Sequence, residues 1–122
     1  MITGTGIDIV NIERIIKLLD EHGERFTSKV LSTEEQNSIP KARPEEFIAG
    51  RFAAKEALAK ATEQKFTLTA VTVMNDSKGK PFFKGDFFSN ELEGCRVHLS
   101  ISHDTGYAAA FVIIESPDEV KK

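Results

Sequence analysis

The chain has 122 residues, of which 40% are hydrophobic and 29% are charged, and its formal net charge is −3 at pH 7. One domain over residues 1–122 is expected, because a chain of this length can bury roughly two-thirds of its unfolded surface. No run reaches the about 18 apolar residues of a membrane span, and no secretory signal is visible, so a soluble cytoplasmic protein is expected. The acidic balance argues against nucleic acid as a partner.

The chain begins with a segment that predicts a strand followed by a helix. Residues 1–10 are rich in β-branched residues, and the pair Gly4 and Gly6 interrupts this strand with flexible points. Asn11 is a suitable N-cap for a helix over residues 12–21, because its side-chain oxygen can accept a hydrogen bond from the first helical turn.

Two more helices are expected before the middle of the chain. Residues 32–35 have the spacing of a capping box that opens a short helix, which Pro40 ends. Pro44 suits the first turn of the longest helix, whose apolar residues recur at helical spacing to about Ala61. Small residues form a thin face on this helix, where another backbone can approach closely: Ala49, Ala53 and Ala57.

The second half of the chain is expected to be mostly strand. The pattern predicts a strand over 68–74, a turn over 75–81 and an irregular segment over 82–94 that covers the sheet. Alternating residues predict an antiparallel hairpin of 95–102 with 107–115. Because helices precede most of the strands, the expected fold class is α+β.

Two carboxylates are the main candidates for chemistry. Asp8 lies among β-branched residues in a strand that reads as buried, where an ionised carboxylate costs several kcal/mol unless a cation offsets it. Glu56 lies in an alanine-rich helix, and the two could share Mg²⁺, which completes its shell with water and phosphate oxygens. The duller alternatives stay open: backbone N–H groups could satisfy Asp8, and Glu56 could form an exposed i,i+4 ion pair with Lys60.

Other features are weaker signals. His103 lies where a strand gives way to a loop, a frequent place for functional residues, although a surface histidine is equally consistent. Residues 3–6 and 77–80 could each bind phosphate through backbone N–H groups, and neither segment is a P-loop. Cys95 is the only cysteine, which excludes an intramolecular disulfide and favours a small core residue.

Several motifs in chain order together resemble one family. They are Gly4-x-Gly-Ile-Asp-Ile-Val10 with Ile12-Glu-Arg-Ile15, Glu46-Phe-Ile-Ala-Gly-Arg-Phe-Ala-Ala-Lys-Glu-Ala57 with Lys60-Ala61, Asn75-Asp with Gly79-Lys-Pro81, Val97-His-Leu-Ser-Ile-Ser-His103, and Tyr107-Ala-Ala109. Their order and spacing resemble the holo-acyl-carrier-protein synthases, the short branch of the 4′-phosphopantetheinyl transferases. The resemblance implies that family's fold, an antiparallel sheet packed with one long and two shorter helices, in a homotrimer with active sites at subunit interfaces.

The resemblance also implies a reaction. Such enzymes move the phosphopantetheine arm of coenzyme A to a serine of apo-acyl-carrier protein in the presence of Mg²⁺, releasing adenosine 3′,5′-bisphosphate and activating the carrier for fatty acid biosynthesis. Carried over by position, Asp8 and Glu56 would bind the metal, and Glu56 would remove the serine proton directly or through a bound water. Lys60 and His103 would stabilise phosphate oxygens.

The remaining roles implied by the resemblance concern coenzyme A and the carrier. The coenzyme A contacts would come from Arg43, Arg51, Gly79, Lys80, Pro81 and, more weakly, Ser102. The two arginines suit the ribose 3′-phosphate because a guanidinium offers a planar fork of donors. The acidic carrier would dock on Arg14 and Lys17, unless these two belong to an ordinary solvated helix face.

One segment departs from the family. Members usually follow the Lys-Ala of the long helix with a Gly-rich loop, whereas residues 62–67 of this chain contain no glycine and are a few residues shorter. Access to the arm, carrier choice or turnover could therefore differ. Two other functions remain open: a non-catalytic binder of coenzyme A or a related nucleotide, and a metal-dependent phosphohydrolase, for which the acidic candidate ligands are few.

Overall fold

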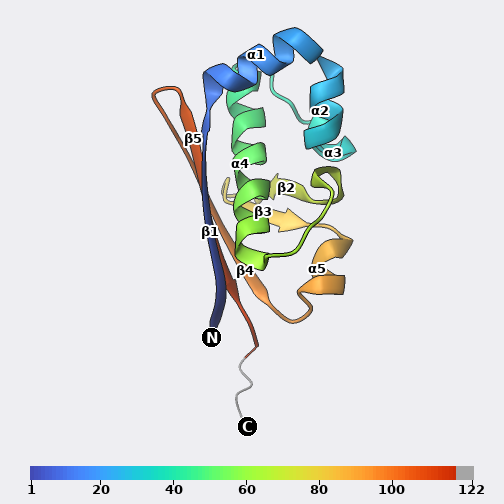
Figure 1. Ribbon diagram of the computed structural model, residues 1–122, viewed down its shortest axis with the longest axis vertical. Helices are drawn as coiled ribbons and strands as arrows, with labels where there is room; N and C mark the ends of the chain where they lie inside the picture. The colour runs from blue at the N-terminus through green and yellow to red at the C-terminus, as the bar shows by residue number, and fades with distance from the viewer. Residues whose placement is uncertain (118–122) are drawn as a thin grey trace.

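A three-stranded antiparallel sheet carries helices on one face only in the described part of the chain (Figure 1). The computed structural model describes residues 1–117, so the last five positions of the expected 1–122 domain lie outside it. The sheet has the order β1 (Ile2–Asn11), β5 (Tyr107–Glu115), β4 (Arg96–Asp104). A separate antiparallel ribbon pairs β2 (Thr72–Asn75) with β3 (Pro81–Lys84).

The helices follow the strand-helix order that the sequence predicts. They are α1 (Ile12–His22), α2 (Glu24–Val30), α3 (Thr33–Gln36), α4 (Pro44–Thr62) and α5 (Asp86–Glu91), with a 3₁₀ turn at Leu68–Ala70. The Asn11 side chain accepts from the backbone N–H of Glu13 at 2.9 Å, which confirms the predicted N-cap of α1. Ser32 and Glu35 form the predicted capping box of α3. The α+β class is therefore confirmed.

Some local expectations are wrong. The segment expected to be irregular over 82–94 contains most of β3 and all of α5, and the helix over 24–30 was not predicted. Residues 68–70 form a 3₁₀ turn, so strand β2 begins later than predicted. These pieces are short, and so few residues give too little periodicity for the pattern to identify an element.

Two glycines of β1 let α4 lie directly on the sheet. A Cβ on Gly6 would collide with the carbonyl oxygen of Ala57, and one on Gly4 would collide with that of Ala61. Both glycines are paired with β5, and the register shifts only between Ile2 and Gly4, so β1 runs through both glycines and the expected break at Gly6 is wrong. Residues 3–6 therefore form no phosphate-binding loop; Gly4 and Gly6 are needed where strand and helix backbones meet.

The other face of the sheet is apolar and uncovered. Ile7 and Ile9 of β1 are 63% and 66% exposed, and Phe111 and Tyr107 of β5 are 41% and 47% exposed. Cross-strand pairing places Ile7 beside Phe111 in one row on this face. Exposed apolar side chains gathered on one face offer a surface for contact with another protein. No helix among residues 1–117 is long and apolar enough to cross a membrane.

The contact between α4 and β1 gives a stability prediction. Gly6→Ala should lower the free energy of unfolding by at least about 2 kcal/mol, because strand and helix must separate to admit the methyl group. The matched control is Thr5→Ala, at the exposed neighbouring position. Urea unfolding at one fixed protein concentration measures both, and equal midpoints for the two variants would contradict the packing role of Gly6.

Candidate functional site

Asp8 and Lys60 form the polar centre of a hollow at the β1 edge of the sheet. Lys60 Nζ donates to Asp8 Oδ1 at 3.1 Å and to the carbonyl oxygen of Ile7 at 2.9 Å. The Asp8 side chain is only 18% exposed. The hollow measures about 400 Å³ and is lined by Ile7, Asp8, Ile9, Lys60 and Ala109. A cation thus does lie beside Asp8, and in this structure it is the side chain of Lys60.

Glu56 lies one helical turn before Lys60 on α4 and is half-buried. The alternative of a Glu56–Lys60 surface pair is wrong, because Lys60 pairs with Asp8 and Glu56 has no ion pair within residues 1–117. Gly6 meets the helix at Ala57, and Asp8 lies two residues further along the same face of β1. The two carboxylates therefore occupy neighbouring parts of strand and helix.

These two carboxylates do not make a complete metal cage. Among the described residues, no group of three or more His, Cys, Asp or Glu side chains is placed to hold a metal ion. Asp8 Oδ2 has no hydrogen-bond partner in that part of the chain, since its one contact is made by Oδ1. Two carboxylates with spare oxygens fit Mg²⁺, which commonly takes one or two protein ligands and fills its shell with water and phosphate.

His103 lies on the far side of α4 from Asp8. Its Nε2 is 3.0 Å from the carbonyl oxygen of Glu46, in the first turn of α4. The imidazole fits there because residue 50 is glycine: a Cβ on Gly50 would lie 2.9 Å from His103 Nε2 and 3.3 Å from Ile101 Cγ2. Gly50 was not among the predicted site residues, although a glycine inside a helical pattern is itself a signal of close packing.

Arg51 is held between α4 and the β2–β3 ribbon. Its guanidinium lies 4.0 Å from the centroid of the Phe47 ring, and its Nη2 donates to Asn75 Oδ1 at 2.7 Å. Its Nε is buried without a hydrogen-bond partner among the described residues. Burial lowers the pKa of Arg51 from its ordinary value, and the nearby Glu35 carboxylate opposes that shift. A fixed guanidinium with an unused donor suits an anion such as phosphate.

The turn between β2 and β3 is closed by its own hydrogen bonds. Asp76 Oδ1 accepts from the backbone N–H groups of Lys78 at 2.8 Å and Lys80 at 2.9 Å. Gly79 donates its N–H to the carbonyl oxygen of Asp76 and has φ 85°, which favours glycine. Phosphate binding by these backbone groups is therefore wrong, whereas the exposed Lys80 side chain and the half-buried Pro81 stay available to a ligand.

Arg43 and Ser102 are two further residues that were predicted to contact coenzyme A. Arg43 occupies the N-cap position of α4 without a side-chain capping hydrogen bond, and its Nε lies 4.0 Å from Glu46 Oε1, at the same helix end as His103. Ser102 instead belongs to the uncovered sheet face. There it helps to line a small hollow of about 140 Å³ together with Ile7 and Phe111.

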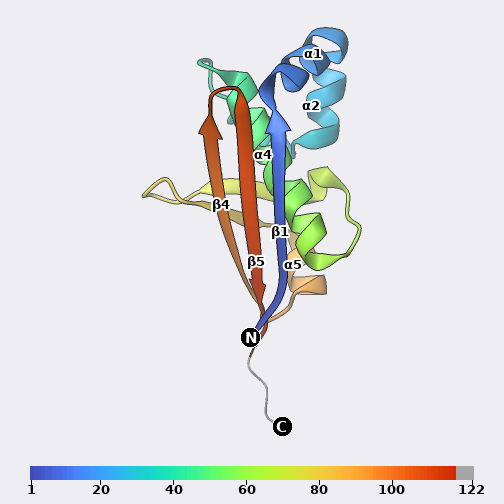
Figure 2. The same cartoon turned by 60° about the vertical axis from the view of Figure 1, so that its left-hand side comes forward.

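The predicted site residues thus fall into two groups at opposite edges of the sheet. Asp8, Glu56 and Lys60 lie at the β1 edge, whereas His103 is on β4, with Arg51 and the β2–β3 turn beyond it. Figure 2 shows β5 between these edge strands and the β2–β3 turn projecting past β4. Two strand spacings alone separate the edges by about 10 Å. One copy of the chain therefore does not bring the two groups together.

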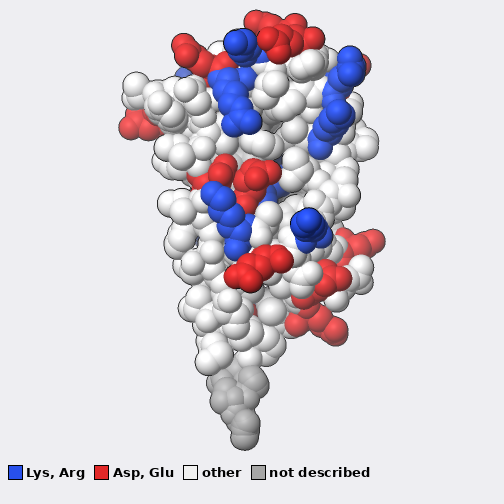
Figure 3. Space-filling model, viewed as in Figure 1, with Lys and Arg blue, Asp and Glu red and all other residues white. Residues whose placement is uncertain are grey.

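Arg14 and Lys17 border a shallow hollow of about 570 Å³ on α1. Ile16 lies in the same hollow and is 40% exposed, beside the two basic residues, and the acidic Glu13 and Asp20 border the hollow as well. Figure 3 shows both basic and acidic side chains at this end of the molecule, over α1 and α2. A partner with acidic and apolar residues would fit this surface.

The chain is similar to known proteins of one family. Residues 4–112 match the family described as the 4′-phosphopantetheinyl transferase superfamily. A holo-[acyl-carrier-protein] synthase of Nitrosospira multiformis is 45% identical over 127 residues, covering 94% of this chain and 99% of the relative.

Two crystal structures of proteins with the same name are also similar. That from Bacillus anthracis, in complex with CoA (3′,5′-ADP), is 39% identical with a TM-score of 0.81, covering 95% of this chain and 98% of that one. That from Neisseria meningitidis is 35% identical with a TM-score of 0.87, covering 95% and 100%.

Gly50→Ala should separate the stability of α4 from the geometry of the site. Alanine favours a helix interior by about 0.5–1 kcal/mol over glycine, and the group it meets is the end of the movable His103 side chain. The unfolding temperature should therefore stay equal or rise while the imidazole is displaced. NMR shifts of the His103 ring protons report the displacement, and unchanged shifts would contradict it.

Proposed function

The chain belongs to the 4′-phosphopantetheinyl transferase superfamily, and on that basis we propose that it transfers the phosphopantetheine arm of coenzyme A to a serine of apo-acyl-carrier protein. The relatives that support this align along nearly the whole of both chains, and one was crystallised with CoA (3′,5′-ADP). The structural observation that carries the proposal is the hollow at Asp8 and Lys60, with Glu56 one turn away. The holo-carrier would serve fatty acid biosynthesis.

The transfer needs one bond to form and one to break. The serine hydroxyl oxygen bonds to the phosphorus that bears the pantetheine, the bond from that phosphorus to the bridging oxygen breaks, and adenosine 3′,5′-bisphosphate leaves. Mg²⁺, when bound by Asp8 and Glu56, would neutralise charge on the pyrophosphate. Glu56 would accept the serine proton through a bound water or directly, and Lys60 and His103 would each hold a phosphate oxygen.

The second group of residues suits the nucleotide end of coenzyme A. Arg51 carries an unused buried Nε–H and is already oriented by Phe47 and Asn75. It would bind the ribose 3′-phosphate together with Arg43, which lies at the N-terminus of the same helix. The remaining contacts would come from the β2–β3 turn, where Gly79, Lys80 and Pro81 border the adenine, and from Ser102.

A complete site requires two copies of the chain. The β1 edge of one copy would supply Asp8, Glu56 and Lys60, and the β4 edge of the next would supply His103 and Arg51. Contacts between unlike edges either close into a ring or extend into a filament, and we propose closure as a homotrimer. The exposed apolar row at Ile7, Ile9 and Phe111 supports such an assembly, because it would be buried between copies.

The hollow on α1 would receive the acyl-carrier protein. Carrier proteins are acidic, and Arg14 and Lys17 offer them positive charge although this chain is negative overall. The exposed Ile16 between them would contact an apolar residue of the carrier. The exposed apolar residue beside two basic ones supports the docking role, whereas the acidic Glu13 and Asp20 in the same hollow are typical of an ordinary solvated helix face.

Incubation with coenzyme A, Mg²⁺ and an apo-carrier should add the phosphopantetheine arm to the carrier, as measured by mass spectrometry. Glu56→Gln should lower the transfer rate by at least about 100-fold, because it removes the general base. The matched control is Glu45→Gln in the first turn of the same helix. Tight coenzyme A binding with no transfer to several bacterial carriers would instead indicate a non-catalytic binder.

Mixing two inactive variants should restore activity if the site is shared. In refolded equal mixtures of Glu56→Gln with His103→Ala, about one quarter of the interface sites combine both intact groups. Glu56→Gln mixed with Asp8→Asn is the control, because both changes fall on the same group and no site recovers. Transfer rates before and after mixing measure this, and equal rates for the two mixtures would show that one copy holds the whole site.

A further inference from the structure

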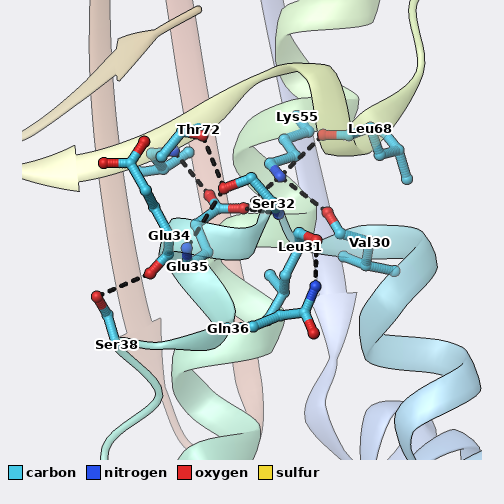
Figure 4. Close-up of polar contacts among 11 residues, drawn as sticks. Val30, Leu31, Ser32, Glu34, Glu35, Gln36, Ser38, Lys55, Leu68 and Thr72 are labelled. Atoms are coloured by element: carbon cyan, nitrogen blue, oxygen red, sulfur yellow. Dashed lines mark hydrogen bonds and ion pairs between the residues drawn. The ribbon is translucent and has the colours of Figure 1, made fainter.

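A fully buried ion pair lies beneath the candidate site and has no part in the proposed reaction. Lys55 Nζ donates to Glu35 Oε1 at 2.6 Å, and both side chains are 0% exposed (Figure 4). Lys55 directly precedes Glu56 on α4, whereas Glu35 comes from α3. In the sequence, Glu35 reads only as a capping-box residue.

Every charged atom of this pair has a partner. Lys55 uses its other two N–H donors on the carbonyl oxygens of Val30 at 2.8 Å and Leu68 at 2.9 Å. Glu35 Oε1 also accepts from the N–H of Ser32 at 2.8 Å, and Oε2 accepts from the N–H of Val73 at 2.7 Å. The pair therefore joins α4 to the end of α2, to α3, to the 3₁₀ turn and to β2.

Stability alone is a weak reason for such a pair. Removing two charges from water costs several kcal/mol each, and apolar residues of similar volume are often as stable or more so. What apolar residues do not reproduce is direction, since each hydrogen bond here fixes one backbone atom relative to α4. Burial lowers the pKa of Lys55 from its ordinary value, and the hydrogen bond that Lys55 donates to Glu35 opposes that shift.

The backbone N–H of Val73, which donates to Glu35, is connected to Arg51 through strand β2. Val73 is two residues before Asn75, which accepts from Arg51 Nη2. Asn75 Nδ2 in turn donates to the carbonyl oxygen of Gly79, in the turn that presents Lys80. The Glu35 carboxylate also lies near enough to Arg51 to raise its pKa against the effect of burial. A continuous set of contacts thus runs from Lys55 to the nucleotide end of the site.

We propose that Glu35 and Lys55 are positioning residues that set the β2–β3 ribbon against α4 and thereby place Arg51 and the turn for the 3′-phosphorylated nucleotide. This role rests on the proposed function. It assigns to Glu35 and Lys55 the preference of the enzyme for coenzyme A over a nucleotide that lacks the 3′-phosphate. The pair leaves the β1 edge alone, so it affects recognition of the 3′-phosphate and not the attack on the pyrophosphate.

The test compares coenzyme A with dephospho-coenzyme A, which lacks only the 3′-phosphate. The double variant Glu35→Gln/Lys55→Met removes both buried charges together and keeps the side-chain volumes similar. Its KM for coenzyme A should rise about tenfold with kcat unchanged within about twofold, because the phosphate contact is displaced. Its KM for dephospho-coenzyme A should stay unchanged. A folded variant that keeps the wild-type preference would overturn the proposal.

A matched control lies next to the pair. Glu34, also on α3, forms an exposed ion pair with Lys84 of β3 at 2.8 Å. Glu34→Gln/Lys84→Met makes the same charge changes at the surface, in a pair that joins α3 to β3, and it should keep the wild-type preference. An equal loss of preference in this control would assign the effect to charge alone and overturn the proposal.

A second variant and a second measurement test the proposal if the double variant does not fold. If the buried double variant does not fold, Glu35→Asp keeps a charged partner for Lys55 but shortens the reach to Val73, and the same loss of preference is expected. Calorimetric affinities for the two nucleotides report the preference without turnover. A wild-type protein that binds both but transfers neither would sink the proposed function, whereas an unchanged affinity ratio in Glu35→Asp would sink only the role of the pair.

Discussion

Close contact between the backbones of α4 and β1 is the constraint on which the candidate site depends. Gly4 and Gly6 leave no side chain between strand and helix, and Ala57 and Ala61 offer a thin face to meet them. Any larger residue would hold the two elements apart. Because they touch, Lys60 reaches the edge of β1 and bonds to Asp8, so charged groups far apart in the chain share one hollow.

Helix α4 contributes residues to both groups of the candidate site. Its C-terminal half faces β1, and its N-terminal half accepts His103 above Gly50 and directs Arg51 toward the β2–β3 ribbon. The sheet order, with β5 in the centre, keeps these groups on opposite edges. Assembly is therefore part of the proposed chemistry, and the uncovered apolar face of the sheet offers the surface on which copies would meet.

Local sequence patterns correctly predicted the features that depend on contacts between residues close together in the chain. Asn11 caps α1, and the capping box at Ser32 opens α3, because both involve atoms within a few residues of one another. The role of the two glycines in β1 was predicted wrongly, because the helix backbone that requires glycine there lies some fifty residues later in the chain. Glu35 shows the same limit, because its capping role is local while its bonds to Lys55 and Val73 cross 20 and 38 residues.

The sequence by itself determined the fold class, the resemblance to a transferase family and the types of residue that could perform the reaction. It also identified Asp8 as a carboxylate in need of a cation. Only the tertiary structure decided that Lys60 lies beside Asp8, that Glu56 is free of the expected surface pair, and that His103 lies on the other side of α4. The physical reason is range: caps and periodicity act within a few residues, whereas strand order and helix packing bring distant residues together.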